Sequence, residues 1–498
     1  MTVRAKRAKT SPSSSTARAR SARRPAKKRL DEVRVERDRG AAADVERLVD
    51  RLSDRDPAVR QGAALAFAQL KDPRGRSALE AAVLDPVAQV RAAAAEALGA
   101  IGRRESRAAL ERALKDEVPR VREQAAWALW SIADDASVDA LIPLLKDAEP
   151  SVRWSAATAL GRLRTRAAFE ALLGALGDEN DRVRRDAILG LGRSGEPVVP
   201  DRIRGFLTDP ARRVRIAAAV VLGRYRDKAA VPTMLERLPL EETFVRPALL
   251  VALGNIGEPS VVPALLGSVD DKAGWVRVCA LHALRSIGGP EAHDAARGRL
   301  ADRLWSVRGA AAECLGRVGG ADDLLPLLQA VEDPHPWPRR GAIYALGELD
   351  LSEAAPRLRE ELQNPSGEVR LAAVWALGKL GDDGAREAMV TLLRQSKPAR
   401  GAAWTIARGE GAVRLISDAE SRLFDSLVQS LGRLRGDPAD PTVLRALEDA
   451  RGRLGDEELD RSSLLPPPEY RGSTVPPTLR ALFDEALSVP ADDGELGC

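Results

Sequence analysis

Residues 116–153 read DEVPRVREQAAWALWSIADDASVDALIPLLKDAEPSVR, and this stretch ends much as it begins. The segment DEVPRVR at its start returns as DAEPSVR after 31 residues, and both segments close on a Val-Arg step. Eleven such steps follow one another at this spacing, with Pro in place of Val once; they begin at Val59, Val90, Val121, Val152, Val183, Val214, Val245, Val276, Val307, Pro338 and Val369. A fixed period of this length predicts stacked supersecondary units.

Each Val-Arg step begins a predicted amphipathic helix. Ala stands four residues after the Val in every unit except at Leu249, and Leu stands eight residues after it except at Phe67. These slots fall on one face of a helix with 3.6 residues per turn. Gly usually follows the Leu, as at Gly99 and Gly161, and we expect it near the helix end, where a stop is common.

A second helix is predicted before each Val-Arg helix, because apolar pairs such as Leu110/Leu114 and Leu141/Leu145 stand four residues apart. A short turn separates the two helices. In most units an Asp in this turn stands six residues before the repeat Arg, and Leu240 and Asn364 are the departures. Such an Asp can accept hydrogen bonds from turn amides and from an Arg of its own or the next unit. We therefore predict a structural ladder of charge-assisted bonds along the stack.

This helix, Asp-containing turn, Val-Arg helix and Leu-Gly ending resemble HEAT repeats, in the short form named after phycobilisome-lyase HEAT-like proteins. The resemblance covers about residues 41–410. It implies an all-α fold, a right-handed α-α superhelix of about 11–12 helix pairs. It says little about function, because similar repeats serve in scaffolds, bilin lyases, a hydroxylase and DNA glycosylases.

We expect four regions: a disordered basic tail over 1–40, the solenoid over 41–410, a helical cap over 411–460 and a loose Pro-rich tail over 461–498. Residues 1–30 carry eleven Lys and Arg and no acidic residue, a composition typical of disorder and of segments that bind polyanions or only solubilise. No run of 18 apolar residues occurs, so no transmembrane segment is expected. Three cysteines without a disulfide pattern suit the cytoplasm.

No motif predicts catalysis, a cofactor or a metal site. Residues 190–195 (GLGRSG) match the dinucleotide fingerprint by letter, but they end a repeat helix instead of following a strand. The three histidines form no metal-ligand pair at helical spacing. The iron hydroxylase built from similar repeats relies on His-Glu dipeptides, and this sequence has none.

Apolar residues stand two and six positions after the repeat Val, on the helix face predicted to line an inner concave groove. These candidate partner contacts are Trp127, Trp154, Leu189, Ile216, Val220, Val251, Val278, Tyr344 and Trp375. Exposed apolar patches usually mark a partner site. The alternative is that adjacent units bury these residues in each other.

Two further rows are candidates for binding. Trp275, Trp305 and Trp337 fall in successive interhelix turns, where they form a rim for a partner or pack against the neighbouring unit. Cations stand ten positions after the repeat Val, at Arg162, Arg193, Arg224, Arg317 and Lys379. They form a basic edge facing an anion, or they interact with the negative end of the helix dipole.

The leading functional hypothesis is a non-enzymatic cytoplasmic scaffold that holds a protein segment in the groove. The second is association with nucleic acid through residues 1–30 and the basic edge, which the mildly acidic remainder of the chain disfavours. A lyase or lyase-accessory role is implied only by the resemblance.

Overall fold

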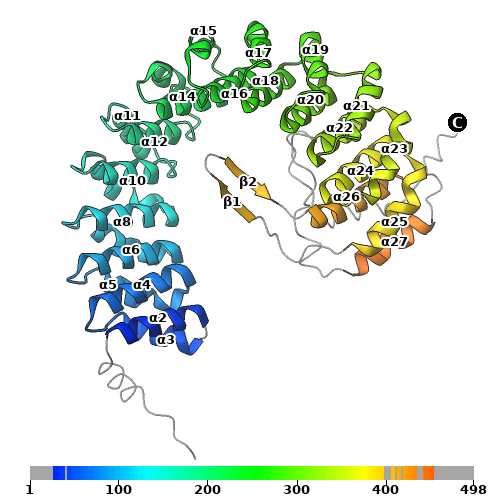
Figure 1. Ribbon diagram of the computed structural model, residues 1–498. Helices are drawn as coiled ribbons and strands as arrows, with labels where there is room; N and C mark the ends of the chain where they lie inside the picture. Colours follow the sequence, from blue (N-terminus) through cyan, green and yellow to red (C-terminus); the bar gives the residue numbers. More distant parts are fainter. Residues whose placement is uncertain are drawn as a thin grey trace, which may run out of the picture. The chain divides into compact units, whose positions relative to one another are not determined.

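The computed structural model describes residues 26–39, 42–396, 405–409, 412–416, 419–434 and 441–453. Its internal contacts divide the chain into two units, Met1–Thr233 and Met234–Cys498. In each unit the helices lie in two layers, with the Val-Arg helices side by side in one of them (Figure 1). Residues 1–25 of the basic tail predicted over 1–40 lie outside the described residues, as does the tail predicted over 461–498.

In the first unit the Val-Arg layer consists of α4 (Pro57–Leu70), α6 (Ala88–Ile101), α8 (Pro119–Ile132), α10 (Pro150–Leu160), α12 (Asp181–Leu191) and α14 (Arg212–Arg224). Its other helices are α2 (Ala26–Arg39), α3 (Ala42–Arg51), α5 (Arg76–Ala82), α7 (Arg107–Ala113), α9 (Val138–Leu141), α11 (Arg166–Ala175) and α13 (Val199–Ile203). Helix α15 (Val231–Arg237) begins where this unit ends.

In the second unit the corresponding layer consists of α16 (Arg246–Ile256), α18 (Gly274–Ile287), α20 (Trp305–Val318), α22 (Pro336–Glu348), α24 (Gly367–Leu380) and α26 (Ala419–Arg433). The other layer holds α17 (Val262–Ser268), α19 (Pro290–Arg299), α21 (Leu324–Val331), α23 (Ala355–Glu360), α25 (Arg386–Gln395) and α27 (Pro441–Gly452). Short 3-10 turns extend or precede many of these helices, for example η4 (Ile142–Lys146), η5 (Arg204–Thr208) and η11 (Glu361–Gln363).

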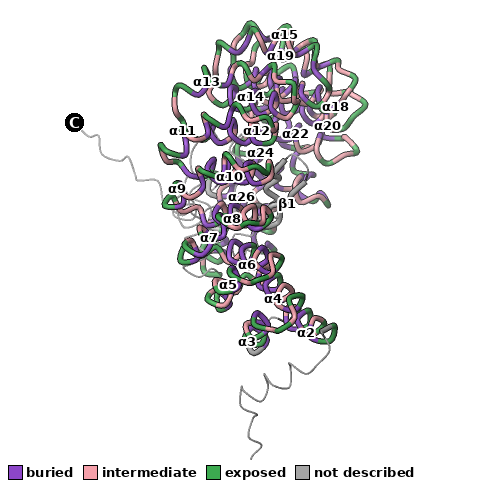
Figure 2. Tube along the Cα trace, turned by 90° about the vertical axis from the view of Figure 1, so that its left-hand side faces the viewer, coloured by how far each residue is buried: buried purple, intermediate pink, exposed green. Residues whose placement is uncertain are grey.

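The repeated apolar slots form the core of both units. Val59, Ala63 and Phe67 on α4 are all fully buried, and the same slots are buried in the units that follow. Buried residues lie on the helix sides that face neighbouring helices (Figure 2). The predicted stack of helix pairs is therefore confirmed.

The repeat Gly has a different role from the predicted helix stop. Helix α6 continues past Gly99 to Ile101, and a Cβ at Gly99 would lie 2.6 Å from the Cα of Ala128 on α8. A Cβ at the repeat Gly161 would likewise lie 2.8 Å from the Cα of Gly190. The glycine lets consecutive Val-Arg helices approach backbone to backbone, and only in some units does it also end the helix.

Residues 26–39 correct the predicted boundary of the basic tail. They form helix α2, which packs against α3 and α4. Arg29 is 1% exposed and pairs with Asp54, with 2.9 Å between Nε and the carboxylate. Arg29 stands 31 residues before Arg60, so the repeat begins one unit earlier than the Val-Arg steps indicate. Lys28 in the Val slot concealed this unit.

The chain after α25 departs from the predicted all-helical cap. Strands β1 (Thr405–Gly409) and β2 (Ala412–Ile416) pair antiparallel, with Thr405 opposite Ile416. Helix was predicted for residues 412–416, so this part of the prediction is wrong. Helix α26 then packs on α24 as the next helix of the Val-Arg layer, and Ser430 Oγ donates to the Val374 carbonyl at 3.1 Å.

Candidate interaction surfaces

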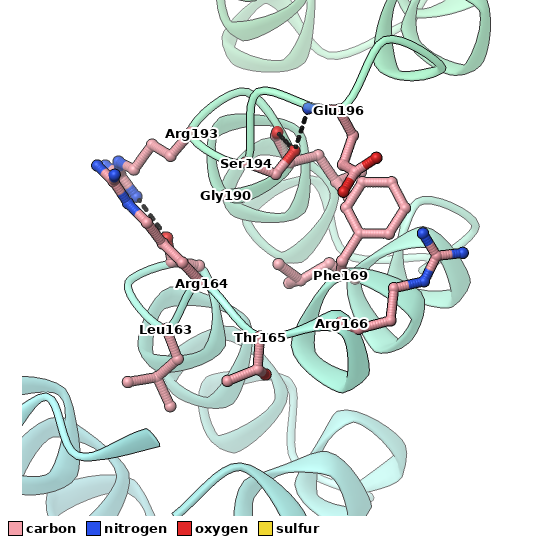
Figure 3. Close-up of a pocket in the computed structure, with 12 residues that line it drawn as sticks. Leu163, Arg164, Thr165, Arg166, Phe169, Gly190, Arg193, Ser194 and Glu196 are labelled. Carbon is pink, nitrogen blue, oxygen red and sulfur yellow. Dashed lines mark hydrogen bonds between the residues drawn. The ribbon is translucent and has the colours of Figure 1, made fainter.

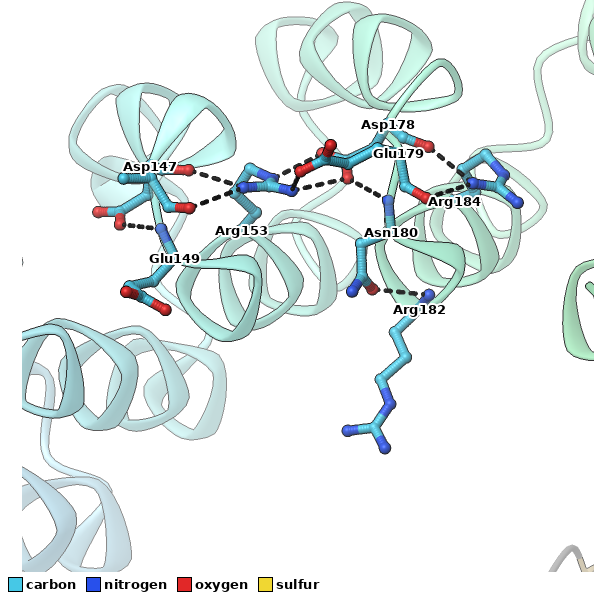
Figure 4. A network of polar contacts seen from close by, with 9 residues as sticks. Asp147, Glu149, Arg153, Asp178, Glu179, Asn180, Arg182 and Arg184 are labelled. Carbon is cyan, nitrogen blue, oxygen red and sulfur yellow. Dashed lines mark hydrogen bonds and ion pairs between the residues drawn. The ribbon is translucent and has the colours of Figure 1, made fainter.

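The predicted Asp-Arg ladder is present in both units. In the first unit, Arg91 donates from Nε and Nη2 to the two carboxylate oxygens of Asp116, at 2.6 and 2.8 Å. Its Nη1 donates to the backbone carbonyl of Asp85, at 2.9 Å. Figure 4 shows the same arrangement at Arg153, which donates to Asp178 of the next repeat and to the Asp147 carbonyl of its own turn. Each Arg thus links two consecutive turns.

The ladder carboxylates are held ionised. Burial alone would raise the pKa of Asp116, but hydrogen bonds from Arg91 and from the Val118 amide outweigh it and lower this pKa below its ordinary value. The same balance lowers the pKa of Asp85 and of Asp147. Because both carboxylate oxygens of Asp116 and all three guanidinium nitrogens of Arg91 are engaged within the stack, we interpret this pair as structural.

The predicted groove residues of the first unit are only partly available. Trp127 and Trp154 are half-buried and contact each other edge to face, with ring centroids 5.4 Å apart. Trp154 Nε1 donates to the buried Asp186 carboxylate at 2.7 Å. Their neighbours Leu189 and Ile216 are also half-buried, whereas Val220 is exposed. Much of this row is therefore covered by adjacent units, as the alternative interpretation held.

In the second unit the remaining predicted groove residues range from exposed to almost fully buried. Val251 is exposed and Val278 is half-buried. Tyr344 and Trp375 are only 3% and 4% exposed, and the centroids of their rings lie 5.1 Å apart. This burial removes Tyr344 and Trp375 from the candidate partner surface, because the tight stacking of α22 against α24 covers both rings.

Aromatic side chains at the starts of consecutive Val-Arg helices form an exposed row in the second unit. We call Phe244, Trp275, Trp305 and Trp337 the aromatic ridge. Phe244 is 63% exposed, Trp275 42% and Trp305 41%. The Phe244 and Trp275 rings lie 5.4 Å apart, and the Trp305 and Trp337 rings 5.3 Å apart.

Of the three tryptophans of the predicted rim, Trp275 and Trp305 are exposed, and their contact with a partner stays a prediction. Trp337 is half-buried, lies over Gly309, and donates from Nε1 to Glu313 at 2.9 Å, so it packs in its turn. Phe244 was missed from the sequence. It stands directly before the repeat Val, as Trp275 does, and an alignment of that slot across units would have identified it.

The predicted basic edge differs between the two units. In the first, Arg193 Nη1 donates to the Gly161 carbonyl at 3.4 Å, and Arg224 Nη1 to the Gly192 carbonyl at 3.3 Å. Arg162 lies over the Trp130 ring, 4.8 Å from its centroid. In the second unit Lys379 is neutralised by Glu348 at 2.7 Å, and Arg317 is exposed. Both predicted explanations therefore have support in the first unit, since these arginines contact helix ends and yet face solvent.

A small pocket of about 90 Å³ lies beside Arg193, between α10, α11 and α12 (Figure 3). Arg164, Arg166, Arg193 and the acidic Glu196 line it together with the apolar side chains of Phe169 and Leu172. The glycine-rich segment 190–195 contributes to its wall. Its first glycines lie inside and at the end of α12 and serve helix packing, which agrees with the prediction that the segment is not a dinucleotide site.

Over the described residues, no group of three or more His, Cys, Asp or Glu side chains is arranged to hold a metal ion. Burial raises the pKa of the Cys314 thiol to about 12 and also raises that of Cys279, so neither thiol is activated. Within the same part of the chain, no helix combines the length and apolarity needed to cross a bilayer.

Comparisons with known proteins agree with this geometry. The HEAT-repeat profile matches residues 84–149, 138–219, 199–285 and 324–407, more than half of the chain. The chain belongs to the HEAT-repeat family. No curated protein matches it. Among solved structures, importin beta is similar at 13% identity and a TM-score of 0.53, over 95% of this chain and 72% of importin beta. Kap95p, in a structure with RanGDP, is similar at 13% identity and a TM-score of 0.50, over 89% of this chain and 70% of its own.

Proposed function

We propose that this protein is a non-enzymatic scaffold that binds a segment of a protein partner on its aromatic ridge. The exposure of Phe244, Trp275 and Trp305 in consecutive units carries the proposal. Soluble proteins rarely leave neighbouring large aromatic side chains in water, and Trp is enriched among residues that dominate binding energy. We further propose that the protein acts in the cytoplasm, where its thiols stay reduced.

Two observations support a binding role over a catalytic one. The best-defined polar network, the Asp-Arg ladder, links consecutive turns of the stack, as Arg91 does with Asp116 and the Asp85 carbonyl. Kap95p, which shares this fold, binds RanGDP, so a HEAT-repeat solenoid is compatible with binding another protein.

The test is affinity purification of the full chain carrying Phe244→Ser and Trp275→Ser, followed by direct binding measurements with the recovered partner. Each lost anchor is expected to cost about 2 kcal/mol, roughly a 30-fold weaker affinity. The control is Leu325→Ser, which removes an apolar side chain that is 75% exposed on α21. Far-UV circular dichroism checks that all variants fold.

Equal recovery of partners by the ridge variant and the control would refute the ridge. The predicted groove stays a separate proposal, which the exposed Val220 and Val251 test when each is changed to Asp. Loss of the partner in those variants alone would move the binding site from the ridge to that face.

A further inference from the structure

Three arginines in the first unit form a row with no carboxylate partner among the residues that the structure describes. We call Arg162, Arg193 and Arg224 the arginine row. They stand at the ends of α10, α12 and α14, one in each of three consecutive repeats, and all three are exposed. Their recorded contacts are a Trp ring and two backbone carbonyls, which neutralise no charge.

The row carries an electrostatic cost that is only partly relieved. Partial burial lowers the pKa of Arg193, and the positive charges of Arg224 and Arg162 lower it further, while the negative charge of Asp186 opposes them. Like charges in adjacent layers repel each other, and an anion bound along the row would remove this repulsion. The ladder arginines of the same helices show the contrast, since Arg153 and Arg184 each hold an Asp.

We propose that the arginine row binds an acidic segment of a protein partner, with carboxylates that meet the arginines in register. The proposal rests on the scaffold function and deepens it by naming the chemistry of a partner at a second surface. Helix layers repeat at about 8–10 Å. An extended segment in the polyproline II conformation brings every third residue to the same side at about 9.3 Å, so an acidic residue at every third position fits this repeat.

A peptide fits the surroundings better than a nucleic acid strand. The pocket beside Arg193 has an apolar floor of Phe169 and Leu172, which suits an aliphatic side chain between the acidic ones. Binding of single strands relies on aromatic platforms for the bases, and the Trp130 ring at this edge is already covered by Arg162.

The experiment measures binding of a fluorescent peptide of repeated Glu-Ser-Leu to the full chain by anisotropy. The row variant carries Arg162→Gln, Arg193→Gln and Arg224→Gln. The control carries Arg103→Gln, Arg104→Gln and Arg202→Gln, an equal loss of charge from exposed arginines of the same unit. Three exposed ion pairs of roughly 0.5 kcal/mol each correspond to about tenfold weaker binding by the row variant than by the control.

Equal affinities of the row variant and the control would overturn the proposal. So would cross-links from a photoreactive form of the peptide that map only to the basic residues 1–25, or a single-stranded oligonucleotide of equal charge that depends on the row more strongly than the peptide does. The ridge variants answer the scaffold question separately. If the ridge variant loses its partner while the row variant binds the peptide as tightly as its control does, the arginine-row proposal is refuted and the scaffold proposal stands.

Discussion

Two rows of arginines run along the same helices of the first unit with the same period, and they differ in their partners. Ladder arginines such as Arg91 donate hydrogen bonds to an Asp of the next repeat and to a carbonyl of their own turn. The row at Arg162, Arg193 and Arg224 holds no acid among the described residues. Periodicity therefore identifies which residues matter to the stack, but the partner of each charge separates a structural role from a binding role.

Acid should separate the two rows most strongly. The pKa values of Asp85, Asp116 and Asp147 lie below those of the unfolded chain. Their stabilisation is therefore fully present above about pH 4 and is lost as the pH falls through the folded values. We expect the first unit to lose stability between pH 6 and pH 3, by at most about 4 kcal/mol for three carboxyls with unfolded pKa values near 3.9, measured by hydrogen exchange of its helices.

A variant with Asn at these three positions provides the control for acid. Asn keeps the turn acceptor, as the chain's own Asn364 does by accepting from the Ser366 amide at 2.9 Å. The variant should begin less stable and lose less stability on acidification. An acid response identical to that of the parent would show that carboxylates outside the ladder control it.

Removal of one ladder carboxylate should give the next largest effect. Asp116→Ala leaves the largely buried Arg91 guanidinium with only the exposed Glu117 carboxylate, 3.8 Å away, and leaves the Val118 amide without its acceptor. We expect a loss of roughly 2–3 kcal/mol, the cost of a broken buried pair reduced for its partial exposure. Arg193→Ala in the other row should change the free energy of unfolding in urea by less than about 0.5 kcal/mol. A comparable loss at both sites would erase the distinction between the rows.

The sequence predicted the ladder better than the surfaces. The Asp of the turn and the Arg of the Val-Arg step recur at a spacing of 31 residues in most repeats, so the pairing of Arg91 with Asp116 follows from stacking. Burial of Trp375 depends instead on how closely α22 approaches α24, which no slot of a single unit encodes. The unit at Arg29 was missed because Lys28 replaces the expected Val within a basic, Ser-rich context. The hairpin at Thr405–Ile416 stands where the repeat has ended and the period no longer guides prediction.

The spacing of both rows depends on glycines between the layers. A Cβ at Gly190 would lie 2.8 Å from the Gly161 Cα and 2.9 Å from Leu172 Cδ1. We expect Gly190→Ala to cost roughly 1–2 kcal/mol by overpacking, despite the better helix propensity of Ala. Gly174→Ala on α11 is the matched control, since no atom lies within 4 Å of its Cβ, and it should be neutral or stabilising. Thermal unfolding of both variants tests the difference, and equal melting temperatures would contradict it.

Replacement by lysine gives the smallest and most selective effect. Arg91→Lys keeps the charge but loses the paired bonds to Asp116 and the bond to the Asp85 carbonyl, since one ammonium cannot reach all three acceptors with the same geometry. We expect about 1 kcal/mol of lost stability in urea unfolding. Arg193→Lys should leave stability unchanged within about 0.5 kcal/mol, because its single bond to the Gly161 carbonyl is long at 3.4 Å. If Arg193→Lys lowers the free energy of unfolding as much as Arg91→Lys does, Arg193 stabilises the stack through its contact with the helix end. Both rows would then be structural.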